Sequence, residues 1–462
     1  MAGPVRLLYH FNADVQSVRR DGNRMVLDVK DWKPIGFAPA HAAHAEAIAA
    51  LEGRGSTLSE LVRIASAGAD LGGKAIHYYL DRFAFGRLLG WTIVDQEGEL
   101  GRVQALAKLF VPRREPLPAG PVAMSRFAYL RRLKETMLLE SGLVRARIEL
   151  KPRGLALLGA ILGAPCKAAS ESLAGALWQL GFFEAVDVEE SAAQRCWEFH
   201  DLLLHEASRA NREVLPVGGT YRFDGAIPPM SAVRPDYSGK RIALPAPDSQ
   251  SIRQRSRSLD DLQAERKSIR DYADSPLPLD MLGEFLWRVC RTTGTLPLQH
   301  QDLLSRRYPA AGSVHELEFY VAARRCEDLR PSVHHYDSHN HALVEFEGSQ
   351  KAALRIVEGC GRAMALQPGR LLPAAAIVVT SRLPRLAWKY EGMAYRASLM
   401  NTGVVYHLMY MVATDMGLAP CATGTGDSRL LEDAIGLDRL EETTIGEFAL
   451  GMPAAAAAAS SD

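Results

Sequence analysis

The fold is best approached from the stretch of residues 386–417, which reads LAWKYEGMAYRASLMNTGVVYHLMYMVATDMG. Its second part, 397–416, is apolar on nearly every side of a helix. We therefore expect this helix to be buried, either inside a domain or at a subunit interface. Its first part places two proton carriers, Lys389 and Tyr390, directly after Trp388. A flat, apolar ligand beside this pair would give both side chains a chemical task.

The composition sets the broad class of the protein. A chain of 462 residues predicts two or three domains. Lys plus Arg equals Asp plus Glu, at 54 each, which argues against nucleic-acid binding driven by excess positive charge. No apolar run is long enough to span a bilayer, and the N-terminus lacks a signal-peptide core, so we expect a cytoplasmic protein without a membrane partner. The six cysteines are scattered, which favours a reduced compartment.

The first part of the chain is expected to hold two winged-helix-like units. In residues 1–115, Thr57 and Glu60 form a capping box before a helix, and a second helix and a strand follow. The same order recurs in 116–190, where Gly181 ends a helix. Winged helices often bind DNA, but the neutral charge favours a protein- or peptide-binding platform.

The remaining chain is expected to divide into three parts. Residues 191–255 are interpreted as a bridging helix and linker, because their second half is rich in Pro and Gly. In 256–453, helices alternate with short apolar strands, which predicts an α+β domain. The low-complexity tail, 454–462, is expected to be disordered.

RKSIRDY, residues 266–272, follows a helix-start pattern. We expect Arg266 and Arg270 to lie one helical turn apart, with Ser268 between them. Two guanidinium groups and a hydroxyl suit a dianionic phosphate. A solvated helix face is the alternative interpretation of the same pattern.

The turn from Pro309 to Gly312 consists of residues with little side-chain bulk and precedes an apolar strand. Backbone with so little bulk can approach a flat ligand closely. An ordinary loop before a strand is the alternative.

Gly424 and Gly426 precede a helix, and Arg429 lies in its first turn. Free backbone N–H groups at this helix start could complete a phosphate site. The spacing is not that of a dinucleotide-binding fingerprint.

HHYDSHNH, residues 334–341, invites a metal-site interpretation, which we reject. DSHN is typical of a turn, and the flanking residues alternate like a hairpin. Neighbouring residues on a strand point to opposite faces, so His334 and His335 cannot both bind one ion. We expect no metal.

Several motifs taken together resemble the flavin-dependent SagB-type dehydrogenases of the nitroreductase superfamily, the azoline oxidases. In chain order they are RKSIRDY (266–272), YPAAGSVHELEFYV (308–321), VHHYDSHNHAL (333–343), WKYEGMAYR (388–396) and GLAPCATGTGD (417–427). The resemblance is strongest after residue 256 and extends upstream to YHFNAD, WEFHDLLLHEASR, GTYRF and RIALPAPD.

The resemblance implies a fold, a cofactor and an assembly. The C-terminal domain would be a nitroreductase-like FMN domain with a mainly antiparallel sheet, surrounding helices and a homodimeric state. Its active sites would lie at the dimer interface, and the segment TIGEFALGMP would reach toward the partner.

The implied roles can be assigned to this chain. The phosphate and ribityl contacts would be Arg266, Ser268 and Arg270. The turn against the isoalloxazine would be Pro309, Ala310, Ala311 and Gly312. The catalytic pair would be Lys389 and Tyr390. The sequence departs from the family pattern at Ala310 and Ala311, in place of Ser-Gly, and at Asn401 and Val404, in place of Asp and His.

The implied reaction is the two-electron oxidation of an azoline to an azole, with the flavin reoxidised by O₂. The substrate would be a peptide or a carrier-bound intermediate, and accessory proteins of a biosynthetic complex would be partners. A nitroreductase or flavin reductase that uses NAD(P)H is one alternative. A non-catalytic peptide-binding partner is another. The sequence does not name the substrate or the base.

Overall fold

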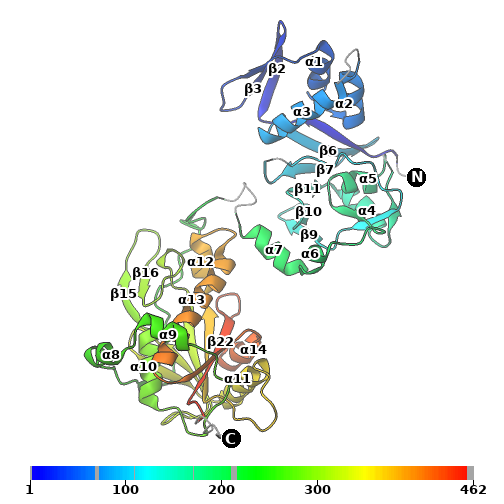
Figure 1. The fold of residues 1–462 in the computed structure, drawn as a ribbon. Helices are drawn as coiled ribbons and strands as arrows, with labels where there is room; N and C mark the ends of the chain where they lie inside the picture. Colours follow the sequence, from blue (N-terminus) through cyan, green and yellow to red (C-terminus); the bar gives the residue numbers. More distant parts are fainter. Residues whose placement is uncertain (1–2, 68–71, 109, 170, 210–215, 455–462) are drawn as a thin grey trace. The chain divides into compact units, whose positions relative to one another are not determined.

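The computed structural model describes residues 3–67, 72–108, 110–169, 171–209 and 216–454. The chain forms two compact units, Met1–Pro216 and Val217–Asp462 (Figure 1). Each unit has its own hydrophobic core. The tail expected to be disordered, 454–462, lies outside the described residues except for Ala454.

Unit 1 is built on a seven-stranded antiparallel sheet with the order β5-β1-β6-β7-β11-β10-β9. In that order the strands are β5 (Ser56–Thr57), β1 (Arg6–Phe11), β6 (Leu89–Asp95), β7 (Gly98–Ala105), β11 (Ala146–Leu150), β10 (Thr136–Ser141) and β9 (Ala128–Leu133). Two three-stranded sheets accompany it: β2 (Val15–Asp21), β3 (Arg24–Val29) and β4 (Ile35–Phe37), and β12 (Cys166–Lys167), β8 (Pro121–Met124) and β13 (Phe183–Ala185).

The helices of unit 1 include the two expected helix–helix–strand arrangements. They are α1 (Ala42–Ala49), α2 (Leu58–Ala65), α3 (Gly72–Phe85), α4 (Pro152–Ile161), α5 (Leu173–Gln179), α6 (Ala192–Arg195) and α7 (Phe199–Ala207). Thr57 and Glu60 form the predicted capping box of α2, and Gly181, with φ +87°, follows α5.

The two winged-helix-like segments are not independent of each other. Strand β7, from the segment 1–115, pairs with β11, from the segment 116–190, and a single core runs from Val5 to Phe183. The predicted bridge, 191–255, is divided at Pro216 between the two units. The pairing of β7 with β11 joins residues some 45 positions apart, which local sequence patterns do not reveal.

Unit 2 is a three-layer α/β/α structure around a second seven-stranded antiparallel sheet. The strand order is β14 (Lys240–Ala243), β19 (Ala342–Phe346), β18 (Val333–Asp337), β17 (Leu317–Ala323), β20 (Ala375–Ser381), β22 (Thr443–Gly451) and β21 (Ala419–Thr423). A hairpin, β15 (Thr292–Leu296) with β16 (Leu303–Arg306), stands apart from this sheet. The mainly antiparallel α+β fold expected for the C-terminal domain is confirmed.

The strand alternation in β17 shows how the layers form. Phe319 and Val321 pack under α10 (Leu279–Val289) and α13 (Ala394–Asp415), whereas Tyr320 and Ala322 pack under α11 (Gln350–Ala363) and α14 (Ser428–Ile435). The other helices are α8 (Ser249–Arg255), α9 (Leu259–Glu265), α12 (Leu383–Lys389) and the short 3₁₀ helix η1 (Ala311–Ser313).

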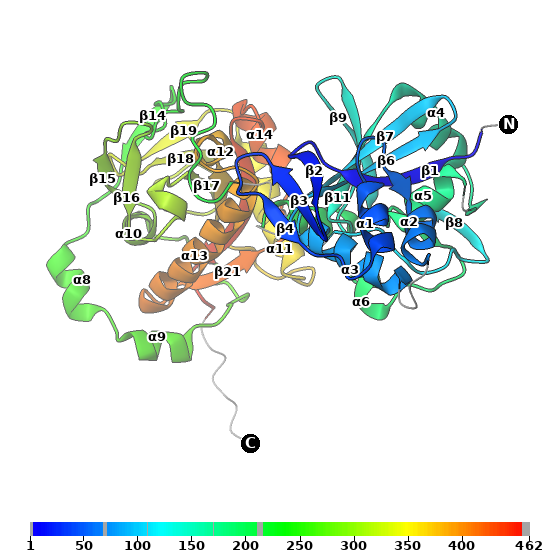
Figure 2. The ribbon, with the colours of Figure 1, turned by 90° about the horizontal axis from the view of Figure 1, so that it is seen from above.

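Helix α13, the long orange helix in Figure 2, is not buried on every side of this chain. One face packs in the core through residues such as Val405 and Met409. The opposite side exposes an apolar stripe that contains Leu399, Met400 and Val404, with Met400 61% exposed. Of the two predicted environments, the inside of a domain therefore accounts for only one face of the helix.

Candidate active site

Helix α12 presents Lys389 and Tyr390 at its C-terminal end. Leu386 and Trp388 anchor the helix in the fold, and the Trp388 indole N–H donates to the carbonyl of Ile227 over 2.8 Å. The helix ends at Lys389, and Tyr390 is already extended, with φ −122° and ψ 137°. Both side chains are half-buried.

The predicted turn meets this pair at Gly312. The Lys389 ammonium donates to the Gly312 carbonyl over 3.1 Å. A Cβ atom on Gly312 would lie 2.2 Å from Tyr390 Oη and 2.7 Å from Lys389 Nζ. Gly312 also has φ +55°, a conformation that favours glycine. Two motifs about 77 residues apart in sequence are thus brought into contact.

The alanines that replace Ser-Gly fit the turn. Ala310 is extended, and neither Ala310 nor Ala311 has a positive φ. The Ala311 N–H donates to Asn401 Oδ1 over 3.1 Å, and the Asn401 amide nitrogen donates to Glu316. Asn401, which departs from the family pattern, therefore fastens the turn to α13.

Arg266 and Arg270 are not one helical turn apart, so that part of the prediction is wrong. Helix α9 ends at Glu265, and the following residues are extended because the Ile269 N–H pairs with the Pro420 carbonyl. Ser268 lies between the two arginines in the chain, so the three residues remain together in one short segment. Both arginines are exposed.

Tyr410 on α13 joins this segment to β21, the strand that leads into the loop with Gly424 and Gly426, which we call the glycine loop. Its hydroxyl hydrogen-bonds with the Ser268 hydroxyl over 2.8 Å and accepts from the Ala422 N–H over 2.8 Å. The Arg266 guanidinium lies 5.4 Å from the centre of the Tyr410 ring.

The glycine loop itself lies beside carboxyl groups. Asp427 caps α14, and the Gly426 backbone packs against the Glu447 carboxyl group. Burial raises the pKa of Glu447 to about 7, and the charge of Asp427 adds to this effect. Arg429 is exposed. A phosphate role for Gly424, Gly426 and Arg429 stays a prediction, and Arg266 and Arg270 offer the more favourable charge.

Helix α13 spans both groups of candidate residues. Asn401 bonds to the turn at Ala311. Tyr410, nine residues further along the helix, bonds to Ser268 between the two arginines. At 1.5 Å per residue the two anchors are about 13 Å apart along the helix. The helix therefore holds the two groups of candidate residues at separate points along its length.

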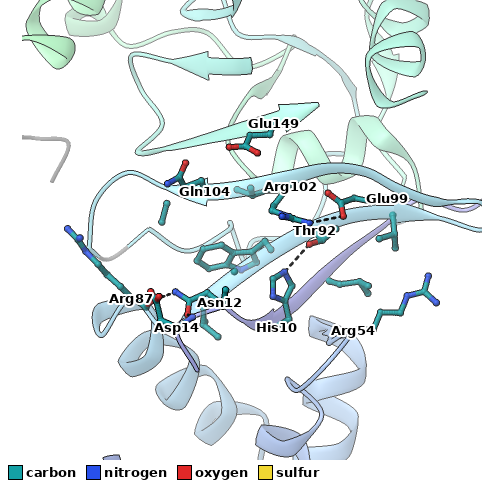
Figure 3. A pocket seen from close by; sticks show the side chains of 18 of the residues that line it. His10, Asn12, Asp14, Arg54, Arg87, Thr92, Glu99, Arg102, Gln104 and Glu149 are labelled. Carbon is teal, nitrogen blue, oxygen red and sulfur yellow. Dashed lines mark hydrogen bonds and ion pairs between the residues drawn. The ribbon is translucent and has the colours of Figure 1, made fainter. Parts of the chain in front are cut away.

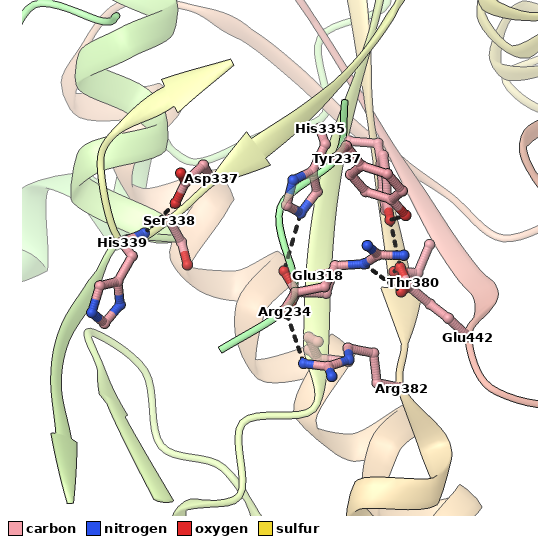
Figure 4. Close-up of polar contacts among 12 residues, drawn as sticks. Arg234, Tyr237, Glu318, His335, Asp337, Ser338, His339, Thr380, Arg382 and Glu442 are labelled. Atoms are coloured by element: carbon pink, nitrogen blue, oxygen red, sulfur yellow. Dashed lines mark hydrogen bonds and ion pairs between the residues drawn. The ribbon is translucent and has the colours of Figure 1, made fainter. Parts of the chain in front are cut away.

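A buried polar network lies at the centre of the sheet (Figure 4). Glu318 accepts from His335 over 3.3 Å and lies 3.7 Å from Arg382. Burial alone would raise the pKa of Glu318, but the hydrogen bond from His335 and the nearby arginines lower it to about 2. Beside it, Glu442 pairs with Arg234 over 2.8 Å.

This network was not predicted from the sequence. A glutamate inside the otherwise apolar strand LEFYVA was a signal that could have identified Glu318. His335 serves this network, whereas His334 lies on the opposite face of β18, as the alternation predicts. The described residues contain no group of three or more His, Cys, Asp or Glu side chains that could hold a metal ion.

Two protein-family models match this chain. The nitroreductase family model matches residues 264–452, which include every candidate site residue. Over this segment, about two fifths of the chain, the protein is similar to the nitroreductase family. The model of the cyanobactin oxidase ThcOx matches residues 122–214. These two matches together confirm the resemblance to SagB-type dehydrogenases and identify the protein as an oxidoreductase.

Individual relatives are distant. A nitroreductase-like protein of Methanocaldococcus jannaschii is 26% identical over 189 residues, which are 40% of this chain and 85% of that protein. A nitroreductase-like structure from Ralstonia eutropha is 20% identical with a TM-score of 0.36, and the match covers 50% of this chain and 97% of that one. A chain of the E. coli microcin synthetase complex with truncated pro-peptide bound is 18% identical with a TM-score of 0.34, over 52% of this chain and 85% of that one.

Among the helices in the described ranges, none is long and apolar enough to cross a membrane.

Proposed function

We propose that this protein is an FMN-dependent oxidase that converts an azoline ring in a peptide or peptide-like intermediate into the aromatic azole. The observation that carries the proposal is the convergence of Lys389 and Tyr390 on Gly312. A desaturation that releases a proton needs a proton acceptor beside the reacting ring. A reductase that only passes hydride from NAD(P)H has no such need.

The residues of the chain fit a flavin mononucleotide. The exposed guanidinium groups of Arg266 and Arg270 suit a dianionic phosphate, and Ser268 adds a hydroxyl. At the turn, Ala310 and Gly312 leave the backbone open to a flat ring. When bound, the flavin would supply a two-electron acceptor that O₂ can reoxidise.

The chain itself supplies the proton chemistry. Aromatising an azoline removes a proton from one carbon and a hydride from its neighbour. Lys389 in its neutral amine form, with Nζ 3.1 Å from the Gly312 carbonyl oxygen, and Tyr390 as a phenolate are the two candidates for the proton acceptor. If the Tyr390 phenolate takes the proton, Lys389 orients it. If the neutral Lys389 amine takes the proton, Tyr390 packs beside the reacting ring.

Unit 1 would hold the peptide part of the substrate. It contains a groove of about 990 Å³ over the face of β1, β6 and β7 (Figure 3). His10 hydrogen-bonds to Thr92 on its floor, and both acidic and basic side chains line it, among them Glu99 and Arg102. Such mixed polarity suits a peptide with charges of both signs rather than a nucleic acid. The match to the ThcOx model over 122–214 supports a substrate of this class.

The working form would be a homodimer. The apolar stripe on α13 exposes Leu399, Met400 and Val404. Contiguous apolar surface of this kind is unfavourable in water and is typical of an interaction site. A second copy of the chain would cover it, and this pairing would give each site access to residues of both copies. Other members of a biosynthetic complex would be further partners.

The direct test is an assay with a thiazoline-containing peptide in air, without NAD(P)H. We expect a yellow protein and a product that has lost two hydrogen atoms, measured by mass spectrometry, together with hydrogen peroxide. The name of the M. jannaschii relative favours a second candidate, a nitroreductase. Reduction of a nitroaromatic with NADPH, and an unchanged thiazoline, would support that candidate and contradict the first.

A further inference from the structure

The segment that opens unit 2 wraps around the end of α12. The Thr220 N–H donates to the Lys389 carbonyl over 2.8 Å, and the Tyr221 N–H lies 3.4 Å from the same oxygen. The Thr220 hydroxyl donates to Glu391 over 3.4 Å. A Cβ on Gly219 would lie 3.4 Å from Lys389 Cγ, so the segment touches both the backbone and the side chain of Lys389. We call residues 219–227 the strap.

Tyr221 has an unusual backbone conformation within the strap. Its φ of +50° is rare for a residue with a side chain, and such strain persists only where surrounding contacts fix it. Its ring stacks on His300, with the ring centres 4.4 Å apart and the planes at 24°. It also meets Trp388 edge-on, at 5.9 Å and 69°.

A second pair of residues holds that stack in place. His300 Nδ1 and Asp224 Oδ2 are 2.7 Å apart, and Asp224 belongs to the strap. The strap is therefore fastened on both sides of Tyr221: at α12 through Thr220 and at the loop between β15 and β16 through His300.

The Lys389 ammonium lies near two aromatic rings. Its Nζ is 6.0 Å from the centre of the Tyr221 ring and 5.5 Å from the centre of the Tyr390 ring. An ammonium near aromatic faces is held by electrostatic attraction as well as by packing. Together with the Gly312 carbonyl, these rings leave the lysine side chain few alternative directions.

We propose that Tyr221 is a positioning residue that keeps Lys389 directed at Gly312, with the His300–Asp224 pair as its support. This inference rests on the proposed role of Lys389. A flexible lysine has many rotamers, and a misplacement of about 1 Å at a reacting group costs on the order of 100-fold in rate. An aromatic ring fixed against Trp388 and His300 removes that freedom.

The test compares Tyr221→Leu with Tyr221→Phe, which retains the ring, and with Tyr78→Leu, an exposed tyrosine of unit 1. The activity readouts are flavin content and the kcat and KM for a small azoline. The structural readouts are hydrogen exchange of the peptide that covers 383–391 and the rate at which a limiting amount of an amine-reactive acylating reagent modifies Lys389. We expect Tyr221→Leu to keep flavin and KM, lower kcat roughly 10- to 100-fold, and speed both exchange and acylation. Tyr221→Phe and Tyr78→Leu should behave like wild type.

Two outcomes overturn the proposal. One is a Tyr221→Leu protein with wild-type kcat, exchange and acylation. The other is a Tyr221→Phe protein that is impaired as much as Tyr221→Leu. If Tyr221→Leu does not fold, His300→Ala, which removes the stacking partner, should show the same changes to a smaller extent, and an unaffected His300→Ala protein would contradict the proposal. If wild type does not oxidise azolines, exchange and acylation still decide whether Tyr221 positions Lys389.

Discussion

Arg266 and Arg270 flank Ser268 in the segment after α9 that Tyr410 anchors to α13. If these guanidinium groups hold the FMN phosphate, each contact contributes roughly 1.5–3 kcal/mol. The double substitution to Ala should therefore yield a folded protein that is largely free of flavin, measured by absorbance after purification. Arg253→Ala, at an exposed position on α8, is the matched control. A double variant as yellow as wild type would show that the phosphate lies elsewhere.

Glu447 allows a prediction on pH and stability. Burial raises its pKa from 4.5 to about 7. Between these two pH values the folded protein therefore keeps a proton on Glu447 that the unfolded chain has lost. The contribution of Glu447 to stability is therefore highest below pH 4.5 and falls as pH rises to about 7, by on the order of 3 kcal/mol.

The variant Glu447→Gln should remove this penalty. Urea unfolding should show it to be more stable than wild type at pH 8 and closer to wild type at pH 5. The control is Glu441→Gln, because Glu441 is exposed. Equal stability of Glu447→Gln and wild type at both pH values would mean that the buried carboxyl is not destabilising.

At the scale of elements, α13 connects the fold to the assembly. Its core face is built into unit 2, and its outer stripe exposes Leu399, Met400 and Val404. Burying a charge in an apolar dimer contact is costly, so Met400→Glu should shift the protein to a monomer in light scattering and lower its flavin content. The control Leu440→Glu changes an apolar residue outside this helix that is 78% exposed. A Met400→Glu protein that stays dimeric would place the interface on another surface.

Local sequence patterns predict some helices and strands of this protein and fail for others. Short apolar runs predicted β17 and β20, which are buried on both faces, and the spacing of apolar residues on one face predicted α10. The apolar character of 397–416 on nearly every side predicted α13. The segment 266–270 was predicted as helical, since a helix-start pattern precedes it. It is extended because Ile269 pairs with Pro420, about 150 residues away, and such pairing leaves no local signal.

Some residues of the candidate site could be predicted from local motifs, and others could not. Lys389, Tyr390 and Gly312 could be predicted because they belong to short motifs with recognisable chemistry. Asn401, Glu318 and Tyr221 could not be assigned roles, since these depend on contacts between distant segments. Asn401 in particular is a departure from the family pattern, yet its side chain holds the turn.

At the scale of the whole molecule, the two units have separate cores, and Pro216 marks the boundary between them. A chain that begins at Val217 keeps the strap and the whole nitroreductase-family match. We expect it to bind flavin and oxidise a small azoline at a rate close to that of the full chain. KM for a peptide azoline should rise at least tenfold, because the groove of unit 1 is absent. An unchanged KM for the peptide would contradict a substrate-binding role of unit 1.

In the proposed reaction, Lys389 and Tyr390 serve proton removal from an azoline beside bound FMN. The most direct measurement is a single turnover without oxygen, in which thiazoline is mixed with the enzyme and the loss of flavin absorbance is followed. We predict that Lys389→Ala and Tyr390→Phe retain flavin and assembly, and that bleaching slows by roughly 10²–10⁴-fold, the usual contribution of a positioned proton carrier. Bleaching at the wild-type rate in a folded, flavin-bound Lys389→Ala protein would contradict the claim.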